Sequence, residues 1–230
     1  MSAMSWPRQR ALLPLVSAIL AGACAPSAQP PAMAPSAAAS RAAVGPVDAG
    51  RDTYALLRDS FQPQGQATLD RLVQDDTQRE CTAAAVAGTA LSSEAAQRIK
   101  RQNADMIRWP ANGFAGEWRR GEKTAQSGVG KQFSDPPSVP SGGNCYACHQ
   151  LAPEELSYGT IGPSLYRYAT LRQATSRAEL ERYTYGKIYD ADAYAACSNM
   201  PRFGARGILT EEQIRDLVAL LLDPASPVNR

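Results

Sequence analysis

The sequence predicts an all-α protein, and three observations favour this fold class. The segment 51–110 is rich in helix-forming residues. The segments 176–179 and 210–213 carry the Ser/Thr-x-x-Glu/Gln pattern that caps helix N-termini. Close to the C-terminus, apolar residues repeat at i, i+3, i+4 and i+7, as on one face of an amphipathic helix: Ile214, Leu217, Val218 and Leu221.

Residues 1–23 have the layout of a secretory signal peptide. Arg8 and Arg10 form a basic start, residues 11–20 are mostly apolar, and Ala21-Gly22-Ala23 is a small-residue exit. The apolar run is short for a bilayer span, and no later stretch approaches about 20 apolar residues. We therefore expect an exported, periplasmic protein without a transmembrane segment.

The fate of Cys24 has two interpretations. Cleavage after Ala23 gives a soluble protein, whereas Leu20-Ala-Gly-Ala-Cys24 approximates a lipoprotein box in which Cys24 carries a lipid anchor. The full chain has 24 Lys and Arg against 22 Asp and Glu, and residues 1–23 contribute two arginines and no acid. The remainder is formally neutral, which argues against nucleic acid as a partner.

Residues 24–50 are mainly Ala, Pro and Ser and are expected to form a disordered tether. Residues 51–113 are expected to be a helical extension that packs on the following domain. One of its helices is capped by Ser92 or Ser93 and stops before Trp109-Pro110, because a residue that precedes proline avoids the helical region.

Residues 114–230 are expected to form the main domain. A short helix spans 117–126, a capped helix runs from Ser176 to about Tyr189, and the last helix begins at Thr210 and ends at Asp223-Pro224. The first and last of these are expected to pack together beside a cofactor.

That cofactor is indicated by Cys145-Tyr146-Ala147-Cys148-His149, a C-x-x-C-H motif. Two thiols at this spacing attach covalently to one haem c, and the imidazole that follows becomes an axial iron ligand. His149 is the only histidine in 230 residues. A zinc site and a dithiol redox pair are the alternatives, but adjacent ligands suit a tetrahedral site poorly, and no strand–helix–strand pattern surrounds the motif.

Met200 is the expected second axial ligand, since a single histidine excludes bis-histidine ligation within the chain. Met33 falls in the tether, and Met106 is interpreted as a core residue of a helix. The segment 159–165 contains Gly162-Pro163, which is expected to turn a carbonyl toward the His149 ring. Residues expected to line the haem pocket are Pro163, Arg202 and Phe203.

Cys81 and Cys197 remain once the haem cysteines and Cys24 are set aside. In an oxidising compartment we expect them to form a disulfide that joins the extension to the Met200 loop. Two buried free thiols are the alternative.

Three segments resemble the SoxX subunit of the SoxXA cytochrome of sulfur oxidation. They are 142–150, 159–165 and 197–204, the last containing Cys-Ser-Asn-Met-Pro-Arg-Phe-Gly; the ending 209–229 is similar too. The likeness covers about residues 66–229 and implies a small class I-type cytochrome c domain with an N-terminal helical extension.

The resemblance also implies partners and a role. The chain would form a periplasmic heterodimer with a SoxA-type subunit. This complex would join thiosulfate to a cysteine of the SoxYZ carrier protein, which is an L-cysteine S-thiosulfotransferase reaction. It would carry electrons to a small acceptor cytochrome and contain no catalytic residue of its own. The alternatives are a self-standing electron-carrier cytochrome and a lipid-anchored subunit of another respiratory complex.

Overall fold

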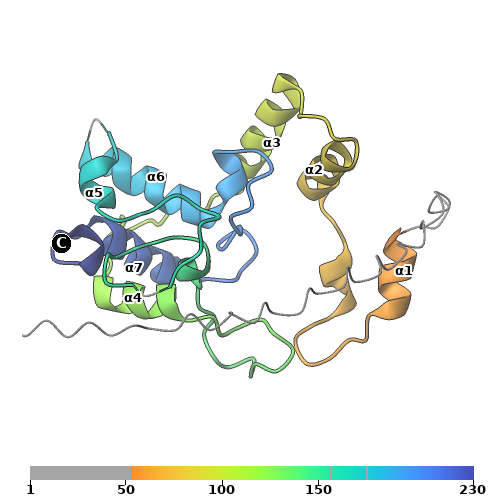
Figure 1. The fold of residues 1–230 in the computed structure, drawn as a ribbon, viewed down its shortest axis with the longest axis horizontal. Coiled ribbons are helices and arrows are strands. Elements are labelled where there is room, and N and C mark those ends of the chain that lie inside the picture. The colour runs from red at the N-terminus through yellow and green to blue at the C-terminus, as the bar shows by residue number, and fades with distance from the viewer. Residues whose placement is uncertain (1–52, 156, 175) are drawn as a thin grey trace, which may run out of the picture. The chain divides into compact units, whose positions relative to one another are not determined.

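The computed structural model describes residues 53–155, 157–174 and 176–230, which belong to one compact unit. The predicted signal peptide and the whole tether, with Cys24 and Met33, lie outside the described residues. Within the described ranges the chain is helical and has no strand, apart from one isolated bridge between Gln64 and Ala67. The all-α prediction is therefore confirmed for this part of the chain (Figure 1).

The helices follow in chain order with short 3₁₀ turns between them. The α-helices are α1 (Thr53–Ser60), α2 (Asp76–Val86), α3 (Ser93–Asp105), α4 (Trp118–Gln126), α5 (Tyr168–Leu171), α6 (Arg177–Tyr189) and α7 (Glu211–Leu222). The 3₁₀ turns are η1 (Leu69–Leu72), η2 (Cys145–Ala147), η3 (Ala191–Ala193) and η4 (Pro227–Asn229).

The helix starts agree with the local sequence signals. Thr210 forms a full capping box with Gln213 at the start of α7. Ser176 accepts a hydrogen bond from the Glu179 N–H at the start of α6, and Ser92 does the same for Ala95 at α3.

The end of α3 differs from the prediction, and with it the interpretation of Met106. The helix ends at Asp105, and the next two amides bond three residues back, Met106 to Asn103 and Ile107 to Ala104. This tighter turn buries Ile107 and leaves the Met106 side chain 45% exposed. The assignment of Met106 as a core residue is therefore wrong.

The core is built where α4, α6 and α7 meet. The apolar face of α7 is buried as its spacing predicts: Ile214, Leu217, Val218 and Leu221, together with Leu220 and Leu222. α4 packs directly on α7, and α6 packs on α7 from another side (Figure 1). The crossing of α4 and α7 is close at Gly121, where an added Cβ would lie 2.1 Å from the carbonyl oxygen of Asp216.

An ion pair reinforces the same crossing. Asp216 of α7 is buried and receives two hydrogen bonds from Arg120 of α4, at 2.7 and 2.8 Å. It also accepts from the N–H of Glu117, the residue that caps α4, at 2.7 Å. A carboxylate placed at these donors ties the first and last helices of the main domain together.

Candidate functional site

The C-x-x-C-H motif folds as one tight turn. Asn144 adopts a left-handed conformation (φ 44°, ψ 44°), and η2 follows it. The amides of Cys148 and His149 both bond back to the carbonyl of Cys145, at 3.1 and 2.9 Å. This turn places both thiols and the imidazole on the wall of a single cavity.

Neither motif cysteine is part of a disulfide. Burial raises the pKa of the Cys145 thiol to about 12. A redox dithiol needs a thiolate at neutral pH, so this environment disfavours that alternative.

The His149 ring is held from behind by a backbone carbonyl. Its Nδ1 atom lies 2.7 Å from the oxygen of Pro163, as predicted for the Gly-Pro element. The Gly162 amide bonds to the Cys148 carbonyl at 2.9 Å and brings the two segments together. An Nδ1–H that donates to Pro163 leaves Nε2 as the ring atom with a free lone pair.

The cavity has a volume of about 470 Å³ and is mostly apolar. Cys145, Cys148, His149 and Met200 all line it, although Met200 is 51 positions beyond His149 in the chain. Pro163 and Phe203 line it too, as predicted. Its apolar wall is completed by residues from α6, α7 and the loop between η2 and α5: Leu151, Ile161, Leu165, Ile188, Leu217, Leu220 and Leu221.

Basic side chains from α6 and the preceding loop also line the cavity, and the sequence analysis did not identify them. Arg172 stacks over the Tyr183 ring with its guanidinium carbon 3.6 Å from the ring centroid. Lys187 is half-buried, donates to the Ala191 carbonyl at 3.2 Å, and has its pKa lowered by burial. The available sequence signal was the i, i+4 spacing of Tyr183 and Lys187 on one face of α6.

The loop that carries Met200 is pinned by polar contacts. Ser198 donates its amide to Asp192 at 2.9 Å, and its hydroxyl accepts from the Met200 amide at 3.2 Å. Gly204 follows, packed so closely on Tyr189 that an added Cβ would lie 2.3 Å from the ring. The thioether is thus presented by a segment with defined backbone positions.

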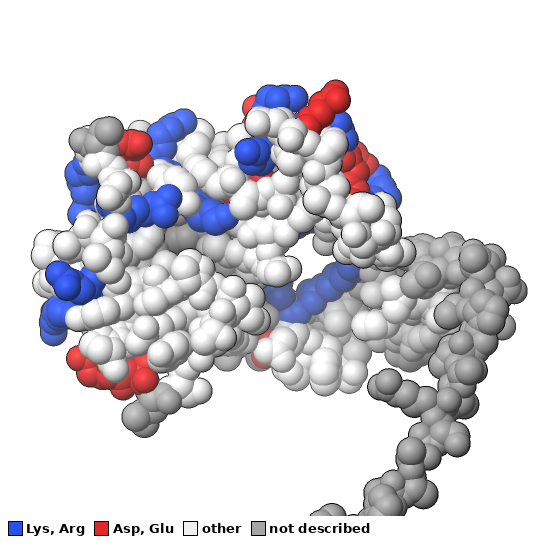
Figure 2. Space-filling view, turned by 45° about the horizontal axis from the view of Figure 1, so that its top comes forward, with Lys and Arg blue, Asp and Glu red and all other residues white. Residues whose placement is uncertain are grey.

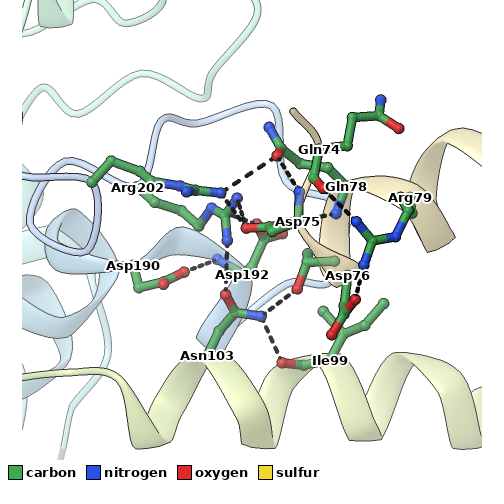
Figure 3. A network of polar contacts seen from close by, with 12 residues as sticks. Gln74, Asp75, Asp76, Gln78, Arg79, Ile99, Asn103, Asp190, Asp192 and Arg202 are labelled. Carbon is green, nitrogen blue, oxygen red and sulfur yellow. Dashed lines mark hydrogen bonds and ion pairs between the residues drawn. The ribbon is translucent and has the colours of Figure 1, made fainter. Parts of the chain in front are cut away.

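Arg202 does not line the cavity, contrary to the expectation for this residue. Its side chain is only 7% exposed and turns toward the extension, where it meets Asp75, Asp192 and Asn103 (Figure 3). A buried guanidinium needs charged or polar partners, and here the extension supplies two of them. In the Met-Pro-Arg-Phe segment, Phe203 therefore lines the cavity, whereas Arg202 contacts the extension.

Cys81 of α2 and Cys197 form a disulfide, which agrees with the predicted pairing. They are consequently unavailable as metal ligands. In the ranges the structure describes, no three His, Cys, Asp or Glu side chains come together as a metal site would require. The zinc interpretation of the motif thus lacks its remaining ligands among these residues.

Part of the cavity wall reaches the surface. Ile161, which lines it, is 73% exposed, and Ala147 and Pro201 are exposed lining residues as well. Figure 2 shows broad uncharged areas on one face of the molecule, with acidic and basic side chains gathered mainly around their margins. No described helix has the length and apolar character that crossing a bilayer would need.

No protein-family model matches the chain. The chain is similar to an uncharacterized lipoprotein of Aquifex aeolicus (strain VF5), with 39% identity over 141 residues. That alignment covers 60% of this chain and 64% of the relative, so the chain spans a little under two thirds of the relative's length.

Proposed function

We propose that the protein is a monohaem c-type cytochrome. The observation that carries this proposal is the meeting of four residues, Cys145, Cys148, His149 and Met200, at one cavity of about 470 Å³. Cofactors and other small ligands bind in pockets of a few hundred cubic ångströms that are lined mainly by apolar groups, and this cavity is of that kind.

Each residue has a distinct task in this proposal. Cys145 and Cys148 would hold the haem covalently, and His149, through Nε2, and Met200 would bind its iron. Pro163 orients the imidazole, and the ring of Phe203 helps to exclude water. Arg172 and Lys187 place positive charge at the cavity, which suits the carboxylates of a haem.

The redox role follows from this ligand set. A haem bound by His149 and Met200 would supply one-electron exchange at a raised potential, with its iron bound by protein side chains rather than by oxygen or peroxide. The exposed wall at Ile161 and Pro201 offers a short route for the electron to a docked partner. We therefore favour electron transfer over oxygen or peroxide chemistry.

We further propose that this cytochrome is the SoxX-type electron-transfer subunit of a thiosulfate-oxidising complex. The support is the resemblance of the haem motif, the Gly-Pro element and the Met-Pro-Arg-Phe-Gly loop. Its partners would be a SoxA-type subunit, the SoxYZ carrier protein and a small acceptor cytochrome, and its compartment the periplasm.

A lipid anchor at Cys24 is also part of the proposal. The similar Aquifex protein is named a lipoprotein, and Leu20-Ala-Gly-Ala-Cys24 approximates the sequence at which such proteins are lipidated. Export before haem attachment and anchoring after it are compatible, because the tether separates Cys24 from the helical unit.

Two measurements test the proposal in sequence. The pyridine-haemochrome spectrum of the purified protein should be that of a haem held by two thioethers, and a Cys145→Ser, Cys148→Ser variant should lose the haem. Absorbance should then report haem reduction by thiosulfate only when SoxA and SoxYZ are both present. A covalent haem that no combination reduces with thiosulfate would support the self-standing electron carrier instead.

A further inference from the structure

The helix α2 is attached to the Met200 loop at two separate points. The disulfide joins Cys81 of α2 to Cys197, three residues before Met200. The cap residue of α2, Asp75, binds Arg202, two residues after Met200, with 2.7 Å between Oδ2 and Nη2. Asp75 also pairs with Arg206 further along the same loop.

The second attachment has its arginine side buried. Arg202 is 7% exposed, and it also pairs with Asp192 at 3.5 Å and donates to Asn103 of α3 at 3.2 Å (Figure 3). Burial pushes the pKa of Asp75 upward, but the hydrogen bond from Gln78 and the charges of Arg202 and Arg206 outweigh it and lower the pKa overall. Asp75 is therefore an anion held at the start of a helix, where the helix dipole favours it.

These contacts involve residues both before and after Met200 in the sequence. Asp192 accepts from Ser198 before Met200 and pairs with Arg202 after it. Asn103 is itself fixed, because its amide nitrogen donates to Thr77 of α2 at 3.0 Å and to the Ile99 carbonyl at 2.8 Å. The loop lacks helical or strand structure between Cys197 and Gly204, so these side chains supply the order that its backbone does not.

We propose that α2 is a strap that positions Met200 at the haem iron, with Asp75 and Cys81 as its two points of attachment. This inference rests on the proposed function, in which Met200 is an axial ligand. It gives the N-terminal extension a role in the redox site, although none of its residues lines the cavity.

The strap has a measurable consequence at the iron. An added ligand such as imidazole can bind only when Met200 has left, so its apparent affinity rises with the population of the open loop. Hydrogen bonds to charged groups contribute about 1.5–3 kcal/mol, so loss of one attachment should raise the imidazole affinity of the ferric protein about tenfold or more.

The informative single variant is Asp75→Asn. Asparagine is an effective N-cap, so α2 keeps its cap while the charge facing Arg202 and Arg206 is lost. Asp76→Asn is the matched control, because Asp76 lies on the same helix turn and, among the described residues, pairs with the exposed Arg79 rather than with the Met200 loop. Cys81→Ser, Cys197→Ser removes the other attachment, and a combined variant removes both.

The strap proposal is tested by titrating the ferric holoproteins with imidazole and following the absorbance. Hydrogen exchange of amides 198–206 is the second measurement. We expect Asp75→Asn and the cysteine variant each to bind imidazole more tightly and exchange faster, and the combined variant to show the largest change. An imidazole affinity of the combined variant equal to that of Asp76→Asn would overturn the strap. If the combined variant does not fold, Asp75→Asn alone decides by the same comparison.

A failed strap is distinguishable from a failed ligand assignment. Met200→Ala should bind imidazole more tightly than every strap variant. If Met200→Ala leaves the affinity unchanged, the assignment of Met200 falls and the strap falls with it. If Met200→Ala changes the affinity and the strap variants do not, only the strap is wrong.

Discussion

The Nδ1 atom of His149 lies 2.7 Å from the carbonyl oxygen of Pro163. This contact fixes the ring orientation and leaves Nε2 directed away from the loop that supplies the carbonyl. The adjacent Gly162 makes it geometrically feasible, since an added Cβ would lie 2.2 Å from His149 Cε1. The backbone of Gly162 and Pro163 thus contacts the imidazole of His149 directly and orients this proposed iron ligand.

Replacement of Gly162 by alanine should disturb the proposed haem site. The new methyl group displaces either the ring or the Pro163 carbonyl, and outer partners of metal-binding histidines typically contribute 10–100-fold in affinity or activity. We expect a lower yield of covalent haem and a shifted Soret band, measured by absorbance per protein. Gly128→Ala is the control, because its Cβ would make only ordinary contacts of 3.5 Å with Asn144. Equal spectra for the two variants would contradict the role of this contact.

Met200→Ala should remove the sulfur-to-iron charge-transfer band of the ferric protein. It should also lower the reduction potential by on the order of 0.1 V, within the range of about 0.8 V that axial ligands span. Spectroscopy and potentiometric titration measure the two effects. Met106→Ala should change neither, because Met106 is 45% exposed and does not line the cavity. A band that persists in Met200→Ala would assign the ligand elsewhere.

Asp216→Asn should weaken the crossing of α4 and α7. The variant loses the carboxylate that accepts hydrogen bonds from Arg120 and from the Glu117 amide. We therefore expect the free energy of unfolding to fall by about 1–3 kcal/mol. Glu212→Gln removes the other, exposed partner of Arg120, at 3.4 Å, and should cost less than about 1 kcal/mol. Urea denaturation of both holoproteins provides the comparison, and similar losses would show that burial of Asp216 is unimportant.

Asp190 should make stability depend on pH in the mildly acidic range. Burial raises the pKa of its carboxyl from 3.8 to about 6, against the opposing attraction of Arg202 and the hydrogen bond from the Asp192 amide. The neighbouring charges are Asp192, Arg202 and Lys187. Because the folded state binds the proton more tightly, this contribution to stability is fully present below about pH 3.8 and is lost as the pH rises through about 6.

Melting temperature measured from pH 4 to 7 tests the role of Asp190. Relative to the wild type, Asp190→Asn should gain stability as the pH rises, and its own curve should be flatter in this window. Asp59→Asn is the control, since the side chain of Asp59 is 68% exposed. The lowered pKa of Asp75 makes stability fall as the pH drops below about 3.8, so Asp75 does not produce the loss of stability with rising pH that is expected from Asp190. Parallel curves for wild type and Asp190→Asn would rule the interpretation out.

Features encoded over a few residues were predictable from the sequence. The helix caps at Ser92, Ser176 and Thr210 and the buried face of α7 follow from spacing alone. The carbonyl of Pro163 at the His149 ring was predictable because the Gly-Pro turn follows the motif closely. The disulfide was predictable by elimination, since Cys145 and Cys148 were assigned to the C-x-x-C-H motif and Cys24 to the end of the signal peptide.

The directions of single side chains were less accessible to the same reasoning. Met106 continues a helical pattern, yet the helix ends one residue before it, and a tighter turn exposes the side chain. Arg202 lies between Met200 and Phe203, but the burial of its charge beside Asp75 and Asp192 directs it away from the cavity. The Met106 outcome depends on where the helix ends, and the Arg202 outcome depends on partners far away in the sequence, such as Asp75.

By itself the sequence determined the helical class, the C-x-x-C-H motif with its single histidine, and the starts of the main helices, because these depend on short-range spacing. Only the tertiary structure decided that Met200 reaches the cavity of His149, that Arg172 and Lys187 add charge there, and that α2 binds both flanks of the Met200 loop. The physical reason is chain separation: burial and charge pairing between Asp75 and Arg202, 127 positions apart, exist only once the helices have packed.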